Sequence, residues 1–316
     1  MNLPSVIFFL GSACLGFLYL SKCVANVLIW TWTMFLRPAK DLRREYGSWA
    51  VITGCTDGIG KALAFELASK GLNLLLVGRN PSKLQQVSHQ ILLQHSTKQQ
   101  QLSVKTVVID LGRCSGEEIL RKMEDETRGL DVGILVNNAG MSYPYAKYFH
   151  EVDEEVMEGV VRVNVEALTW LTKALIPRMV EKKKGAVVNI GSASTTAVSS
   201  FPLYTLYAAS KGYVGMLSRS IGLEYKQYGI DVQCQIPLLV ATKMSRIKKA
   251  TLFCPSAETY GKASVRWIGH AHPACIPYWP HALQAFFLSL LPVSLLDYCL
   301  FTYFNEMRHR CLAKDR

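Results

Sequence analysis

Residues 49–61 read WAVITGCTDGIGK, an apolar run that leads into a glycine-rich turn with GxxxGxG spacing. The run 49–53 is typical of a buried strand, and a helical pattern follows from residue 59. Glycines at such a turn let a pyrophosphate approach the backbone at the positive end of the helix. Glycine-rich turns also occur for purely structural reasons, but the position of this one between a strand and a helix favours dinucleotide binding. The expected contact residues are Gly54, Thr56, Asp57, Gly58, Ile59 and Gly60.

Outward from this turn, short apolar runs alternate with longer helical patterns. The expected strands are residues 49–53, 72–77, 104–109, 133–137, 186–191 and 231–236. The expected helices are residues 59–70, 81–95, 115–127, 153–180 and 204–227, with Ser82, Ser115 and Asp153 as N-caps. This alternation predicts an α/β fold, a Rossmann-like single domain built on a doubly wound parallel sheet.

The composition is that of an ordered globular chain: 316 residues, 50% apolar and 19% charged. It excludes a disordered charged tail, a collagen and a coiled coil. A net charge of +11 favours anionic partners, but no recognisable module with interleaved aromatic residues points to nucleic acid. Nine dispersed cysteines without a CxxC pair argue against disulfides and zinc, and the histidines lack ligand spacing, so no metal is expected.

Residues 1–36 are expected to form a hydrophobic membrane anchor. Leu3–Leu20 has no charged residue and would measure about 27 Å as a helix, close to the hydrocarbon thickness of a bilayer. The second apolar run, 23–36, extends this helix, lies in the interface or makes a second crossing. A cleaved signal peptide is disfavoured because Met1–Ser5 has no basic residue. The basic linker 37–47 then places the body of the protein in the cytosol.

Polar residues follow three of the expected strands. Arg79 stands where an acidic residue would bind the ribose 2′-hydroxyl of NAD; an arginine there favours the 2′-phosphate of NADP over a merely solvated role. Lys61 is a second candidate for that phosphate. Asp110 either accepts a hydrogen bond from the adenine amino group or caps the next helix. Asn138 lies in the run Asn137–Gly140, which is either a ligand contact or a structural turn.

Tyr207-Ala208-Ala209-Ser210-Lys211 is the most specific motif in the chain. A tyrosine and a lysine four residues apart share one helix face. A phenol has a pKa near 10, and a neighbouring ammonium that stabilises the phenolate would lower it, making a tuned general acid. A core tyrosine with a surface lysine gives the same spacing by chance, but the other motifs in the chain make chance a poor explanation.

Together, TGCTDGIG, NNAG, Asn164, the serines after Asn189 and YAASK resemble the short-chain dehydrogenase/reductase family over residues 48–240. The resemblance implies a proton donor at Tyr207, with Lys211 as its partner and as a binder of the nicotinamide ribose. It implies that Asn164 holds a relay water and that Thr242 contacts the nicotinamide carboxamide. A serine would polarise the substrate carbonyl. Family spacing from the tyrosine suggests Ser194, whereas the local strand-end pattern suggests Ser192, which we prefer.

A closer resemblance is to microsomal very-long-chain 3-oxoacyl-CoA reductases, especially those of plants. It rests on residues 231–237, 240–244 and 277–281 and on apolar segments at both ends. It implies NADPH-dependent reduction of a long-chain 3-oxoacyl-CoA at the endoplasmic reticulum membrane, with the catalytic domain facing the cytosol. The further partners expected are membrane lipid, other elongase subunits and a second copy of the chain.

Two other functions stay open at this stage. The resemblance extends to membrane-bound 17β-hydroxysteroid dehydrogenases, so a steroid ketone is an alternative substrate. A weakly active scaffold or elongase subunit is an alternative of another class. The domain boundaries expected from the sequence are 48–245 for the catalytic core and 246–316 for a substrate loop followed by an apolar C-terminal region.

Overall fold

A computed structural model of the chain describes residues 3–95, 101–270 and 273–313. The chain divides into two compact units, Met1–Ala39 and Lys40–Arg316. The second unit contains the sheet and every residue expected in the site.

The core of the second unit is a seven-stranded sheet in the order β3-β2-β1-β4-β5-β6-β7, with all neighbours parallel. Its strands are β1 (Trp49–Thr53), β2 (Asn73–Gly78), β3 (Val104–Val108), β4 (Val132–Asn137), β5 (Gly185–Ile190), β6 (Ile230–Gln235) and β7 (Ala274–Cys275). The strand order reverses direction between β1 and β4. The doubly wound α/β prediction is therefore confirmed, and β7 is an added short edge strand.

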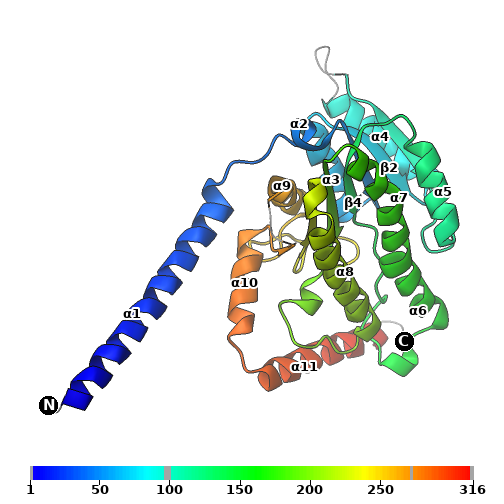
Figure 1. Ribbon diagram of the computed structural model, residues 1–316. Coiled ribbons are helices and arrows are strands. Elements are labelled where there is room, and N and C mark those ends of the chain that lie inside the picture. Colours follow the sequence, from blue (N-terminus) through cyan, green and yellow to red (C-terminus); the bar gives the residue numbers. More distant parts are fainter. Residues whose placement is uncertain (1–2, 96–100, 271–272, 314–316) are drawn as a thin grey trace. The chain divides into compact units, whose positions relative to one another are not determined.

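Helices cover both faces of the sheet (Figure 1). They are α3 (Gly58–Ser69), α4 (Pro81–His95), α5 (Gly116–Glu126), α6 (Glu154–Val161), α7 (Leu168–Glu181), α8 (Thr205–Glu224) and α9 (Ala257–Trp267). Apolar side chains of α3, α4 and α9 pack on one face, and those of α5 and α7 pack on the other. The expected helix 153–180 is interrupted by a π-helical segment, η3 (Arg162–Ala167), between α6 and α7.

Strand periodicity sorts the core residues between the two faces. In β1, Ala50 and Ile52 join one cluster and Val51 joins the other, and all three are fully buried. Burying a side chain such as Ile52 contributes about 1.5–3 kcal/mol. Such strands have no solvated face, which is why the sequence shows continuous apolar runs here instead of alternation.

The helix N-caps match the predictions only in part. Ser115 forms a capping box with Glu118 at the start of α5. Ser82 lies inside α4, and the cap is Asn80, whose Oδ1 accepts a hydrogen bond from the Lys83 amide at 3.0 Å. Asp153 is the N-cap residue of α6 as predicted, but its side chain binds Lys147 Nζ at 2.6 Å and makes no capping hydrogen bond.

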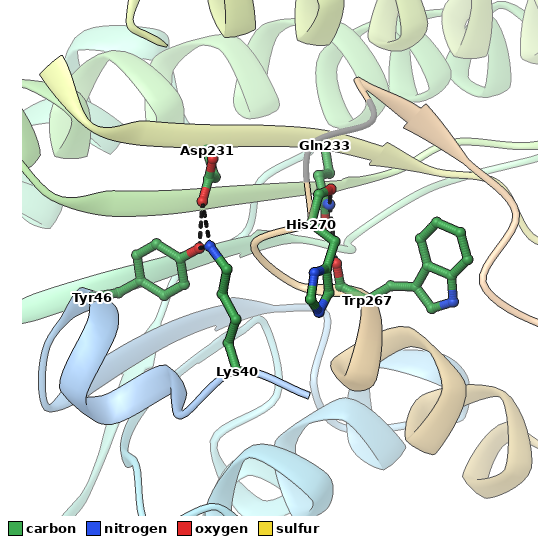
Figure 2. A network of polar contacts seen from close by, with 6 residues as sticks. All are labelled: Lys40, Tyr46, Asp231, Gln233, Trp267 and His270. Atoms are coloured by element: carbon green, nitrogen blue, oxygen red, sulfur yellow. Dashed lines mark hydrogen bonds and ion pairs between the residues drawn. The ribbon is translucent and has the colours of Figure 1, made fainter. Parts of the chain in front are cut away.

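The basic stretch after the apolar N-terminal segment is partly folded onto the sheet, and not wholly a free linker. Within it, α2 (Leu42–Tyr46) packs against the core, where Tyr46 is 3% exposed. Figure 2 shows the side chains of Lys40 and Tyr46 converging on Asp231 in β6. Lys40 Nζ lies 3.4 Å from Asp231 Oδ2, and the Tyr46 hydroxyl donates to the same oxygen. Burial and the neighbouring carboxylate both raise the pKa of Tyr46.

A second polar contact on β6 holds the end of α9. Gln233 Nε2 donates to the carbonyl of Trp267 at 3.0 Å and also to that of His270 (Figure 2). Two residues on, Gln235 Nε2 donates to the Ser264 carbonyl at 3.0 Å. These bonds explain why glutamines alternate with apolar residues in a buried strand.

The first unit is one helix. α1 (Leu3–Thr31) continues without a break into the π-helical segment η1 (Trp32–Leu36). It passes straight through Lys22, so the structure has no turn there to separate two crossings. Its 34 residues have a mean hydropathy of 2.0 in their most apolar window, and the helix is long and apolar enough to cross a membrane.

The chain ends in two helices, α10 (Trp279–Ser289) and α11 (Val293–Leu312), bent by 119° at the break between them. Large apolar side chains around this bend are exposed: Phe286, Phe287, Leu290, Leu291, Val293 and Leu295. The inner side of α11 packs on the segment before α8, where Phe304 contacts the rings of Phe201 and Tyr204. The apolar C-terminal region expected from the sequence is therefore helical, with a packed inner side and an exposed bend.

Candidate active site

The expected site residues gather at the carboxyl edge of the sheet, around the reversal between β1 and β4. Gly54 has a φ of +63°, and a β-carbon on it would lie 2.8 Å from the Ala139 Cα. Asn138 Nδ2 donates to the carbonyls of Thr53 and Gly54 at 3.0 and 3.1 Å. Only glycine permits this close approach of the two backbone segments. The hydrogen bonds of Asn138 then fix the conformation of the turn.

The start of α3 faces the loop that follows β6. Asp57 Oδ1 accepts a hydrogen bond from the Gly58 amide at 2.9 Å, and Lys243 Nζ lies 2.5 Å from its other oxygen. Partial burial opposes ionisation, but these two contacts outweigh it and lower the pKa of Asp57. A β-carbon on Gly58 would lie 3.3 Å from Thr242 Cγ2, which places Thr242 directly over the turn. Ile59 packs against the core.

The residues expected near the adenosine part of a dinucleotide lie at the ends of β2 and β3. Arg79 is exposed just beyond β2, and Thr56 Cγ2 would lie 3.6 Å from a β-carbon on Gly78 at the end of that strand. Lys61 Nζ instead lies over the ring of Phe65, 5.7 Å from its centroid. Asp110 Oδ1 accepts from the Gly112 amide at 3.0 Å, so it caps this turn and not the following helix.

The side chain of Tyr207, on α8, lies next to that of Ser192, two residues after β5. Burial raises the pKa of Tyr207, and the Ser192 side chain lowers it by less. The YxxxK spacing predicts that the lysine neighbour lowers this pKa. In the free protein burial dominates, and the phenol is protonated at neutral pH, as a proton donor must be.

The side chains of Ser192 and Ser194 have different surroundings. Ser192 Oγ accepts a hydrogen bond from the Ser194 amide at 3.2 Å and faces Tyr207. The Ser194 hydroxyl is buried and has no hydrogen-bond partner in the described part of the chain. The geometry therefore puts Ser192 beside the phenol.

Lys211 lies one turn after Tyr207 and is 6% exposed. Its ammonium donates to the Ile190 carbonyl at 2.8 Å, and Nζ would be 3.6 Å from a β-carbon on Gly140. Burial lowers the pKa of Lys211 to about 8. Within the described residues it makes this one hydrogen bond, and an ammonium has three donors. Two N–H groups thus remain for the hydroxyls of a ribose, which is the fit that a nicotinamide nucleotide requires.

Asn164 lies in the π-helical segment η3, a distortion that often marks functional sites in helices. Its Oδ1 accepts from the Met141 amide at 2.8 Å, and its Nδ2 donates to the Met141 carbonyl and to Ser210 Oγ, both at 2.9 Å. Both amide hydrogens are used, so the side chain fixes the strand-end segment and keeps one lone pair of Oδ1 for a water.

Sequence reasoning missed the polar layer beneath the site. Asn137 Nδ2 donates to Asn189 Oδ1 at 2.8 Å and to Thr172 Oγ1 at 3.0 Å, and Asn189 Nδ2 donates to Ser218 Oγ at 2.9 Å. Asn137 is the last residue of β4 and Asn189 is the last but one of the neighbouring β5, a signal that was visible in the sequence. Tyr143 was also missed: it stacks on Tyr204, and its hydroxyl accepts a hydrogen bond from the amide of Leu206 in α8.

A protonated phenol paired with a serine, next to a buried lysine and a glycine turn at the reversal point of a Rossmann-like sheet, is the arrangement of a dinucleotide-dependent oxidoreductase. The sequence profile of the short chain dehydrogenase family matches residues 48–252. The chain belongs to that family.

Among curated relatives, a very-long-chain 3-oxoacyl-CoA reductase-like protein of Arabidopsis thaliana is 47% identical over 90% of this chain and 89% of its own length. The very-long-chain 3-oxoacyl-CoA reductase of Anas platyrhynchos is 38% identical over 85% of this chain and 83% of its own. A human protein named inactive hydroxysteroid dehydrogenase-like protein 1 is also 38% identical, over 80% of this chain and 74% of its own.

Two solved structures extend the comparison. A short-chain dehydrogenase from Sphingobium yanoikuyae in complex with NADPH has a TM-score of 0.64 and 27% identity, covering 76% of this chain and 92% of its own. A metagenomic short-chain oxidoreductase in complex with NADP has a TM-score of 0.55 and 26% identity, covering 63% and 83%.

Proposed function

We propose that this protein reduces a long-chain 3-oxoacyl-CoA to the 3-hydroxyacyl-CoA with NADPH, as a step of fatty acid elongation. The observation that carries the proposal is the pairing of a protonated Tyr207 with Ser192 at the carboxyl edge of the sheet. The substrate class rests on the 47% identity to a reductase-like relative over nearly the whole chain.

Each side chain has a separate task in this reaction. Tyr207 donates its phenolic proton to the oxygen of the substrate carbonyl as negative charge develops there. Ser192 donates a hydrogen bond to the same oxygen, which stabilises charge where it forms. Lys211 holds the ribose hydroxyls and stabilises the phenolate left on Tyr207. When bound, the reduced nicotinamide supplies a hydride to the carbonyl carbon.

The choice of NADPH rests on charge at the end of β2. Arg79 is exposed there, in the position where an acidic side chain would select the ribose 2′-hydroxyl of NADH. A charge-assisted contact between an arginine and a 2′-phosphate contributes about 1.5–3 kcal/mol. The NADPH and NADP complexes of the two related structures support the same choice. The remaining expected contacts are those of the glycine turn, Asp110, Asn138 and Thr242.

The protein is proposed to sit on the endoplasmic reticulum membrane, with its catalytic domain in the cytosol. Support comes from the apolar helix Leu3–Leu36 and from the basic residues that follow it. The exposed apolar side chains at the bend between α10 and α11 would contact membrane lipid. The same membrane would present the long acyl chain and bring other elongase subunits, or a second copy of the chain, into reach.

The test uses the full chain in membranes. Wild type and Tyr207→Phe are incubated with 3-oxoacyl-CoA and either NADPH or NADH, and loss of nicotinamide absorbance is followed. We expect turnover with NADPH, little with NADH, and none with Tyr207→Phe even though it still binds the cofactor. A parallel assay with a steroid ketone separates the steroid alternative. Absence of turnover on both substrates, with NADPH still bound, would favour the alternative that the protein is a weakly active scaffold. One human relative is named as inactive.

A further inference from the structure

The motif Pro277-Tyr278-Trp279-Pro280-His281 lies beyond residue 252, where the match to the family profile ends. Its histidine occupies the first turn of α10 and is fully buried, at 0% exposure. A fully buried histidine needs hydrogen-bond partners for both ring nitrogens.

Both ring nitrogens of His281 bind the backbone of the loop after β6. The Leu238 amide donates to Nδ1 at 3.3 Å, and Nε2 lies 3.1 Å from the Leu239 carbonyl oxygen. An amide can only donate and a carbonyl can only accept, so this pair fixes the tautomer with the proton on Nε2. The ring thus bridges two consecutive residues of one loop.

The surroundings keep this ring neutral and in place. The ring of Tyr278 meets it edge-on at 5.0 Å, and Tyr260 packs at 6.1 Å. Burial lowers the pKa of His281 to about 4, against smaller opposing effects of backbone groups of Leu239 and Phe253. Nδ1 therefore stays an acceptor across the physiological pH range.

The loop that His281 holds lies against the glycine turn and against the segment that carries Ser192. From the end of β6 it runs to Thr242, which lies over Gly58, and to Lys243, which pairs with Asp57 at the start of α3. The Pro237 carbonyl in the same loop accepts a hydrogen bond from the Ala193 amide at 3.0 Å, next to Ser192. The loop thus touches both the nucleotide side and the serine side of the site.

We infer that His281 is a positioning residue that fixes the loop 236–242, and through it Thr242, in the conformation that closes on the nicotinamide half of the cofactor. The inference rests on the proposed function for the identity of that cofactor. The contacts of His281 with the loop stand independently of it. The C-terminal region would in this way set cofactor affinity from outside residues 48–252, which match the family profile.

The test compares His281→Phe, which keeps a ring of similar size but removes both hydrogen bonds, with His281→Asn, whose Oδ1 can replace Nδ1 as acceptor. His309→Phe, at an exposed position of α11, is the matched control. The first readout is hydrogen–deuterium exchange of the peptide 236–244 in full-length protein without cofactor. The second is the Kd for NADPH, measured by nicotinamide fluorescence, together with the split between KM for NADPH and kcat.

We expect faster exchange in this peptide and about a tenfold higher Kd and KM for NADPH in His281→Phe, the effect of losing one net hydrogen bond. His281→Asn should recover part of both effects, kcat should change much less than KM, and His309→Phe should match wild type. Unchanged loop exchange in His281→Phe, or a drop in thermal stability with no change in NADPH affinity, would overturn the inference. If loop exchange responds but wild type binds no NADPH, the proposed function fails and the positioning role does not.

Discussion

Ser192 and Ser194 differ by two positions, yet it is Ser192 whose side chain lowers the pKa of Tyr207, whereas the Ser194 hydroxyl has no partner among the described residues. If Ser192 polarises the substrate carbonyl, Ser192→Ala should lower kcat by about 100-fold, the usual cost of removing a donor to a developing oxyanion. Ser194→Ala removes a buried hydroxyl without a described partner and should change kcat little. Steady-state rates of the two variants in membranes decide this, and a larger loss at position 194 would reverse the assignment.

Lys211 makes the stability of the free protein depend on pH. Its pKa is about 8 when folded, against about 10.4 in an unfolded chain. Between these values the unfolded state binds more protons, so the free energy of unfolding should rise with pH across this window. Below about pH 8 both states carry the charge, and this contribution is constant and unfavourable.

The expected gain between pH 7 and 10 is about 2.5 kcal/mol relative to Lys211→Met, which has no proton to release. Denaturant unfolding of the two proteins without cofactor, in the same detergent from pH 7 to 10, measures it. Parallel curves for wild type and variant would show that the buried amine does not titrate in this range.

At the scale of elements, sequence periodicity predicted the strands and helices that have a local pattern. It missed those that form only through contacts with residues distant in the sequence. The strand β1 was predicted with its observed ends because an apolar run closed by a glycine turn marks both boundaries. The helix α9 was missed because its stretch is basic and mixed, and its buried face, with Tyr260 and Val265, becomes visible only against α3. The two-residue strand β7 has no periodicity of its own and exists because β6 offers it an edge.

The candidate site divides in the same way. Residue identities and spacing predicted Tyr207, Lys211 and the glycine turn, since their chemistry is carried by short motifs. The partners that orient them come from elsewhere in the chain. Ser210 and Met141 form hydrogen bonds with Asn164, and His281 forms one with the loop before Thr242. These partners are far apart in the sequence, so no local motif indicates them.

The docking of α2 is an element-scale feature with a measurable energy. Tyr46→Phe removes the hydrogen bond to Asp231 and leaves the carboxylate with Lys40 alone. Because a partly buried hydrogen bond to a charged group is involved, we expect a loss of about 1.5–3 kcal/mol in the free energy of unfolding. Tyr228→Phe, at a more exposed tyrosine, should cost much less. Chemical denaturation of the two variants side by side tests this, and equal losses would mean that the contact contributes nothing specific.

At the scale of the whole molecule, the same docking constrains how the protein can meet a membrane. Lys40 binds Asp231, and Arg43 Nη1 donates to the Gly71 carbonyl at 2.9 Å, so basic residues counted as a cytosolic flank are part of the folded body. Whichever side of the bilayer receives these residues therefore also receives the catalytic core. The basic residues that set the membrane orientation and the catalytic core therefore lie on the same side of the membrane.

Protease treatment of sealed microsomes tests this orientation. The positive-inside rule places Arg37, Lys40, Arg43 and Arg44 on the cytosolic side, and the compact unit that begins at Lys40 must follow them. We expect an antibody to the catalytic core to lose its signal without detergent, while a lumenal marker stays protected until detergent is added. Protection of the core would place both the basic flank and the proposed nucleotide site in the lumen. The cysteines, all free in the structure, would then face an oxidising compartment, and the site would lose access to cytosolic NADPH.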